Sequence, residues 1–82
     1  MSVHITCTWD SGVRVLHLEG WLEGDNVGEL ERVARGAAEP LRLDLTGLRS
    51  TDTAGLEALR ALRAQGAVLV GASPYLRLLL AP

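Results

Sequence analysis

The stretch from Leu43 to Leu56 reads Leu-Asp-Leu-Thr-Gly-Leu-Arg-Ser-Thr-Asp-Thr-Ala-Gly-Leu and indicates the class of fold. It begins in a short β-strand, predicted over 41–45, after which Thr46 and Gly47 begin a turn. Hydroxyl and carboxylate side chains then precede a helix, which the apolar spacing predicts over 53–65. A strand that leads through a polar loop into a helix is the repeating unit of an α/β fold.

Two short segments before this stretch predict a β-hairpin. Side chains alternate in polarity over 3–9, turn residues occupy 10–12, and β-branched and aliphatic residues fill 13–18. Gly20 is expected to close the second strand.

A first helix is predicted after the hairpin. Asp25 and Asn26 offer an N-cap, and Glu29, three residues after Asn26, would complete a capping box. Gly36 and Pro40 end the helix. Its buried stripe is expected to comprise Val27, Leu30, Val33, Ala34 and Ala37.

The last third of the chain predicts one more strand and one more helix. A continuous apolar run over 67–70 is typical of a buried strand, and Ser73 with Pro74 would begin a helix over 75–80. The order ββαβαβα predicts a single domain spanning 1–82, of the α/β class bordering on α+β, with helices packed on a small mixed sheet. The leucines of the last helix cannot all face inward, so an exposed apolar patch is expected there, as at an interface or homodimer contact.

Composition excludes several kinds of partner and compartment. The 82 residues include eight basic ones, all arginine and spread over 14–77, and the formal net charge is −2. Such a chain has no cationic stripe for nucleic acid. No apolar run approaches the roughly 20 residues that span a bilayer, and no signal-peptide pattern begins the chain. The single Cys7 cannot form an internal disulfide, so we expect a cytoplasmic protein without direct membrane insertion.

Catalytic and metal-binding patterns are weak in this sequence. His4 and His17 both fall in predicted strands, and His17 is interpreted as a packed core residue because its neighbouring alternate positions are apolar. Glu19, Glu23 and Asp25 lie around a strand end and a helix start, where acidic side chains complement the helix dipole. We therefore predict no enzyme, metal or cofactor site, with a small enzyme or metal protein that uses these side chains as the alternative.

Thr53 is the residue with the clearest potential for regulation. The first amides of a helix lack partners within the helix and lie at its positive end, so a phosphate on Thr53 would be tolerated there. That phosphate would add about −1.5 to −2 charge to the surface. Thr51, Asp52 and Thr53 are equally the residue types that cap ordinary helices. From the residues alone, both interpretations remain open.

The motif around Thr53 resembles a known family. Segment 43–48 followed by 52–56 is similar to the core signature of STAS domains, the fold of bacterial anti-sigma factor antagonists. Gly20-Trp21-Leu22-Glu23 resembles the Gly-x-Leu-Asp of the family, and 66–71 with 73–79 resembles its last strand and helix. The resemblance covers 13–80 and implies the small mixed sheet derived above.

The resemblance implies a binding module switched by phosphorylation. In such antagonists, the residue after the motif aspartate is phosphorylated by a partner anti-sigma factor, a serine/threonine kinase, and the unphosphorylated form binds that kinase to release a sigma factor. Thr53 occupies this position, Asp52 would orient the site, and Gly55 would permit close approach. The implied partner-binding residues are Glu23, Asp25, Asp52, Thr53, Ala54 and Gly55.

Several positions depart from the pattern of the family. Thr53 replaces the commoner serine, Ala54 stands where a second hydroxyl is frequent, and Glu23 stands where aspartate is usual. The sequence to Pro82 also lacks the final strand-like segment and long helix of many members.

A second branch of the same family gives an alternative function. The short chain and its Asp-Thr-Ala-Gly motif also resemble the STAS subunit of Mla-type phospholipid transporters, which binds the cytoplasmic ATPase of an ABC system. Both functions would make the protein a binding module in which a face of the helix at 53–65 docks on a nucleotide-using partner. Only the antagonist function requires phosphorylation of Thr53.

Overall fold

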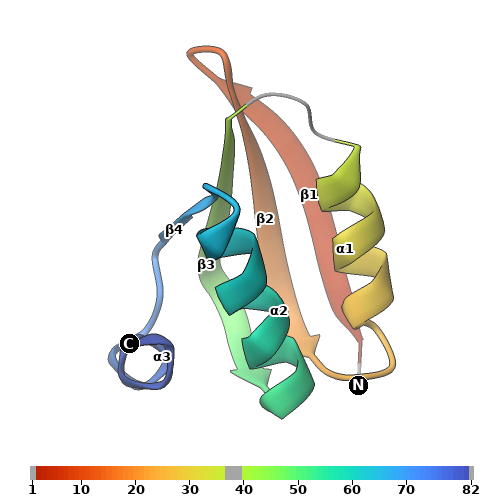
Figure 1. The fold of residues 1–82 in the computed structure, drawn as a ribbon, viewed down its shortest axis with the longest axis vertical. Coiled ribbons are helices and arrows are strands. Elements are labelled where there is room, and N and C mark those ends of the chain that lie inside the picture. The colour runs from red at the N-terminus through yellow and green to blue at the C-terminus, as the bar shows by residue number, and fades with distance from the viewer. Residues whose placement is uncertain (1, 37–39, 82) are drawn as a thin grey trace.

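The computed structural model describes residues 2–36 and 40–81, and its elements follow the predicted order (Figure 1). The strands are β1 (Val3–Asp10), β2 (Val13–Leu22), β3 (Leu41–Thr51) and β4 (Val68–Val70). The helices are α1 (Val27–Arg35), α2 (Thr53–Ala64) and α3 (Pro74–Leu80). The predicted order ββαβαβα is confirmed.

The four strands form one mixed sheet in the order β1-β2-β3-β4. β1 pairs antiparallel with β2 as the predicted hairpin, whereas β2 with β3 and β3 with β4 are parallel. Figure 1 shows α1 and α2 on one face of the sheet, each beginning near the edge where β2 and β3 end. The parallel pair therefore brings two strand ends and two helix starts to one edge of the molecule.

The core lies between the sheet and the helices. Leu16 and Leu18 of β2 alternate with residues of the opposite face, and both are fully buried. Leu30 of α1 and Leu59 of α2 are buried in the same apolar cluster. Burying one leucine side chain contributes about 1.5–3 kcal/mol, so this cluster fixes how the helices sit on the sheet.

Two strands continue past the residues that were expected to end them. β2 passes Gly20, where φ is +96°, and the pairing of β2 with β3 shifts register on either side of this region. A Cβ at Gly20 would lie 2.5 Å from the carbonyl oxygen of Ser2, to which Trp21 N–H donates at 3.0 Å. The predicted strand end at Gly20 and the predicted turn at 46–47 were wrong, because local irregularities in the pairing accommodate these residues within the strands.

The start of α1 also differs from its prediction. Asn26 is the N-cap residue, but its side chain makes no capping hydrogen bond to the helix. Its Oδ1 instead accepts from Glu23 N–H at 2.8 Å, and its Nδ2 donates to Trp21 O at 2.9 Å. The predicted capping box was wrong, because Asn26 uses its side chain to fold the loop between β2 and α1. Ala37, predicted for the buried stripe of α1, lies outside the described residues.

The later helices divide their apolar residues between core and surface. In α2, Ala58 is buried and Ala61 is exposed. In α3, Leu76 and Leu80 are buried, whereas Leu78 is 77% exposed, which confirms the expected outward-facing leucine.

Candidate functional site

The candidate site forms where β2 and β3 end. The chain leaves β2 into the loop 23–26, and it leaves β3 through Asp52 directly into α2. Carboxyl ends of parallel strands are where open α/β sheets commonly present their binding residues. The fold thus brings together the two segments that hold the predicted site residues.

Asp52 connects these two segments through a single carboxylate. As the N-cap of α2, it accepts from Gly55 N–H through Oδ1 at 2.8 Å. Its Oδ2 accepts from Gly24 N–H, in the other segment, at 2.9 Å. Asp52 therefore caps the helix and holds the loop against it at the same time.

Gly55 is buried beneath this connection. A Cβ at Gly55 would lie 2.6 Å from the backbone oxygen of Leu22, and closer still to Thr51 Oγ1. Only a residue without a side chain lets the first turn of α2 approach the end of β2 so closely. The close approach that Gly55 permits is to Leu22 and Thr51 of this chain.

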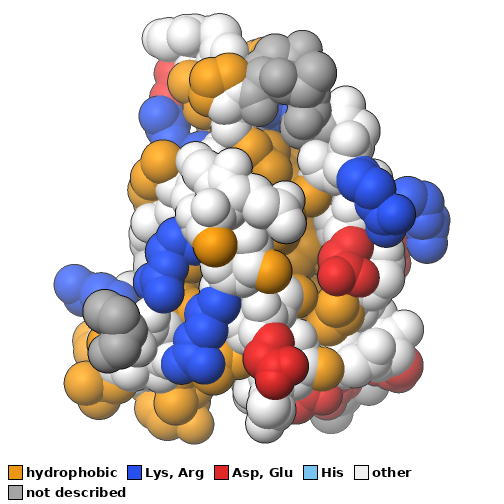
Figure 2. All heavy atoms as spheres, in the orientation of Figure 1, with side chains coloured by type: hydrophobic (Ala, Val, Ile, Leu, Met, Phe, Trp, Pro, Cys, Tyr) orange, Lys and Arg blue, Asp and Glu red, His pale blue; other side chains and the backbone are white. Residues whose placement is uncertain are grey.

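The other predicted residues lie at the surface around Asp52. Thr53, Ala54 and Asp25 are exposed, and Glu23 is half-buried. Gly24 is also exposed, and a Cβ there would lie 3.7 Å from that of Ala54. The strand-end surface is defined here as Glu23, Gly24, Asp25, Asp52, Thr53 and Ala54. Figure 2 shows acidic side chains gathered at the lower end of the molecule, where α1 and α2 begin.

Gly24 is a site residue that sequence reasoning missed. Its N–H anchors Asp52, and its lack of a side chain leaves room beside Ala54. The available signal was a glycine directly after Glu23, at the point where the chain leaves β2.

Hydrogen bonding lowers the pKa of Asp52. The Gly55 N–H is the main cause and the Gly24 N–H the second, because both donate to the ionised carboxylate. A carboxyl group whose pKa is lower in the folded state stabilises the fold above its unfolded pKa of about 3.9. That stabilisation is lost as the pH falls through the lowered value.

This linkage predicts a pH-dependent effect of Asp52→Asn. The variant should unfold at lower urea concentration than the unchanged protein near pH 7, and the difference should shrink as the pH falls below about 4. The measurement is the urea midpoint by circular dichroism between about pH 7 and pH 2. Asp44 also has a lowered pKa, mainly because the Thr46 hydroxyl donates a hydrogen bond to its carboxylate. Asp44 is present in both proteins, so its contribution to stability cancels when their urea midpoints are compared. A difference independent of pH would refute the role given to Asp52.

His17 does not occupy the predicted core position. Its ring lies on the sheet face away from α1 and α2, with 37% of the side chain exposed, and bonds to Thr8 and Asp44. The prediction of a packed core histidine was wrong, because Leu16 and Leu18 take the inward positions on either side of it.

His17 and the acidic loop do not form one site. His17 is bonded on the open sheet face, whereas Glu23 and Asp25 belong to the strand-end surface. Within residues 2–36 and 40–81, no three side chains of the His, Cys, Asp or Glu types are grouped as metal ligands. Over the same residues, no helix has the length and apolar character needed to cross a membrane.

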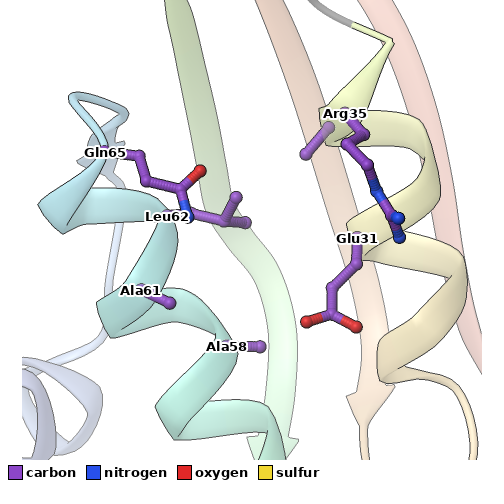
Figure 3. Close-up of a pocket in the computed structure, with 7 residues that line it drawn as sticks. Glu31, Arg35, Ala58, Ala61, Leu62 and Gln65 are labelled. Atoms are coloured by element: carbon purple, nitrogen blue, oxygen red, sulfur yellow. The ribbon is translucent and has the colours of Figure 1, made fainter.

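A groove of about 330 Å³ lies between α1 and α2. Figure 3 shows Leu62 and Gln65 of α2 directed towards α1, and Glu31 of α1 directed into the space between the helices. Its lining residues are Glu31, Ala34, Arg35, Ala58, Ala61, Leu62 and Gln65. None of the predicted site residues is among them, so the strand-end surface is separate from this groove.

Solved structures with the same architecture include two anti-sigma factor antagonists. The STAS domain of an antisigma-factor antagonist from Rhodobacter sphaeroides has a TM-score of 0.65 and 22% identity, covering 84% of this chain and 86% of its own. The unphosphorylated anti-sigma factor antagonist SpoIIAA has a TM-score of 0.67 and 20% identity, covering 93% and 78%. An uncharacterized Shewanella loihica protein with a SpoIIAA-like fold has a TM-score of 0.54 and 13% identity, covering 89% and 69%.

No protein-family model matches the sequence, and no curated protein is significantly similar to it. At these levels of identity, likeness to solved structures establishes the fold. The chain has the fold of STAS domains, in agreement with the resemblance of its sequence motifs.

Proposed function

We propose that this protein is a non-enzymatic regulatory module that acts as an anti-sigma factor antagonist. The strand-end surface binds a bacterial anti-sigma factor with serine/threonine kinase activity, and phosphorylation of Thr53 by that kinase weakens the complex. The module thereby regulates transcription in the cytoplasm. The observation that carries the proposal is the exposed Thr53 hydroxyl, directly after Asp52, on a surface shared by two strand ends.

The strand-end surface is suited to close docking. Gly24, Thr53 and Ala54 are exposed and small, so a partner can approach the backbone of both segments. Asp52 is held by two backbone hydrogen bonds, so its carboxylate need not be ordered on binding. A surface already fixed in the free protein loses less conformational entropy when a partner binds.

A phosphate on Thr53 would change docking without unfolding the domain. Thr53 is the first residue of α2, where the free amides of the helix tolerate negative charge. The phosphate would also stand beside Asp52 and add about −1.5 to −2 charge, which a docked partner would have to desolvate. The expected result is a folded protein with a surface that no longer fits its partner.

The proposal is supported by the kind of protein that shares the fold. Two of the similar structures are described as anti-sigma factor antagonists, and one of them as the unphosphorylated form. In this chain, the same fold brings the ends of β2 and β3 to one edge of the sheet, where Thr53 is exposed.

Pairwise binding with purified candidates tests this function. The partners are the anti-sigma kinases of the host and, for comparison, the ATPase of an Mla-type ABC transporter, each titrated against the unchanged protein, Thr53→Ala and Thr53→Glu. Binding to a kinase that Thr53→Glu abolishes would support the proposal. Binding to the transporter ATPase alone, with equal affinity for all three proteins, would overturn it and favour the ABC accessory function.

A further inference from the structure

A hydroxyl, an imidazole and a carboxylate lie in line on the face of the sheet opposite α1 and α2. Thr8 Oγ1 of β1 is 2.8 Å from His17 Nε2 of β2. His17 Nδ1 is 2.9 Å from Asp44 Oδ2 of β3. None of these three residues belongs to the strand-end surface, and the proposed regulatory function does not use them.

The sheet itself holds the three side chains in place. His17 is paired with Asp44 across the parallel β2–β3 register and with Thr6 across the β1–β2 register. Thr8 is two residues further along β1, on the same face as Thr6, and reaches the ring diagonally. Positions in three paired strands are more rigid than positions in loops, so the alignment is fixed before any reaction.

The hydrogen bonds determine which nitrogen of His17 carries the proton. Asp44 Oδ1 accepts from Thr46 N–H at 3.0 Å and from the Thr46 hydroxyl at 2.6 Å. These bonds, the hydroxyl first, lower the pKa of Asp44, so its carboxylate is ionised and can only accept. Nδ1 of the neutral ring must therefore donate to Asp44, and Nε2 presents its lone pair to the Thr8 hydroxyl.

We propose that Thr8 is a nucleophile that accepts an acyl group from activated acyl esters, with His17 as its general base. Thr8 Oγ1 attacks the carbonyl carbon of the donor, and the hydroxyl proton passes to His17 Nε2. The bond between the acyl carbon and the leaving oxygen then breaks, and the proton on His17 passes to that oxygen. The products are an ester on Thr8 and the free alcohol or phenol, and Asp44 acts as a positioning residue.

The surroundings of Thr8 favour a single acylation over repeated turnover. Thr8 is exposed and the His17 ring is partly exposed, so a small donor can reach the hydroxyl without a conformational change. Among the described residues, Thr8, His17 and Asp44 do not line the groove between α1 and α2 or the hollows beside Gly71 and Pro40. Because the donor binds weakly, we expect a single acylation and not repeated turnover. The product to detect is therefore the ester on Thr8.

Thr6 provides an internal control in the same molecule. It is exposed on the same face of β1 and lies opposite His17 in the register. In the described part of the chain, the ring bonds to Thr8 and Asp44 and not to Thr6. Since general-base assistance contributes about 10²–10⁴-fold, Thr8 should be acylated at least about 10² times faster than Thr6.

The test treats the purified full chain with p-nitrophenyl acetate and follows acetylation of each peptide by mass spectrometry. Cys7 and Tyr75 are exposed and can react too, so only site-resolved labelling is informative. The expected result is a Thr8 ester that forms about 10²-fold faster than one on Thr6. Equal labelling of the two threonines would overturn the proposal. Both threonines are compared within the unchanged protein, so the result does not depend on the folding of a variant.

Two variants assign the roles within the relay. His17→Gln should reduce labelling of Thr8 to the rate of Thr6, and retained labelling would overturn the assignment of the base. Asp44→Asn should slow labelling and shift the ring proton of His17 from Nδ1 towards Nε2, seen in the nitrogen NMR signals of the imidazole. A merely structural role for Asp44 would leave those signals unchanged in a folded variant.

Discussion

Thr53→Glu is expected to lower the affinity of the protein for its kinase partner by about 10²-fold or more. An unpaired charge buried in an interface costs about 3–5 kcal/mol, and each 1.4 kcal/mol corresponds to a factor of ten. The fold should be unaffected, because Thr53 is exposed and glutamate is favourable in the first turn of a helix. Thr53→Ser keeps the hydroxyl and should bind within about threefold of the unchanged protein.

Isothermal titration against the purified kinase measures this difference. Thr6→Glu is the matched control, because it makes the same substitution at an exposed threonine on the opposite face of the sheet. The control should retain full affinity. If Thr6→Glu and Thr53→Glu weakened binding equally, net charge would explain the result and the strand-end surface would lose its assigned role.

Gly55→Ala should destabilise the protein by about 2–3 kcal/mol, although alanine is the better helix former. The added Cβ would lie 2.6 Å from the backbone oxygen of Leu22, which cannot rotate away as a side chain can. Either α2 moves off β2 or its first turn unwinds, and both weaken the cap made by Asp52. A chain of 82 residues has roughly 4–12 kcal/mol of total stability, so this loss is large.

Gly28→Ala is the matched control for this prediction. Gly28 lies in the first turn of α1, and a Cβ there would have no atom within 4 Å among the described residues. It should leave stability unchanged or raise it by up to about 1 kcal/mol. Urea unfolding of both variants makes the comparison. Equal stability of Gly55→Ala and Gly28→Ala would contradict the packing described for the start of α2.

The sequence was sufficient to predict the order of elements and the mixed sheet, because those follow from local periodicity and turn residues. It was not sufficient for the ends of β2 and β3. Gly20 and the pair Thr46-Gly47 have the composition of turns, and only the shifted pairing of β2 with β3 keeps them in strands. Register irregularities depend on the neighbouring strand, which no local pattern encodes.

The sequence predicted which residues form the candidate site more completely than it predicted the role of each residue. Asp52 and Thr53 were identified from a helix start, but the bond from Gly24 to Asp52 joins segments 28 positions apart. The Asn26 side chain was expected to cap α1 and instead folds the loop after β2. His17 was expected in the core, because alternation identifies two faces of a strand without indicating which one the helices cover.

Phosphate mapping tests whether Thr53 is the residue through which the kinase regulates the protein. The protein is incubated with its purified kinase partner and ATP, and modified residues are assigned by peptide mass spectrometry, with Thr53→Ala in parallel. We expect near-stoichiometric phosphate on Thr53, none on Thr53→Ala, and loss of the complex as the phosphate is added. A kinase that binds the strand-end surface but leaves Thr53 unmodified, or phosphorylates it without weakening the complex, would show that Thr53 is not the switch.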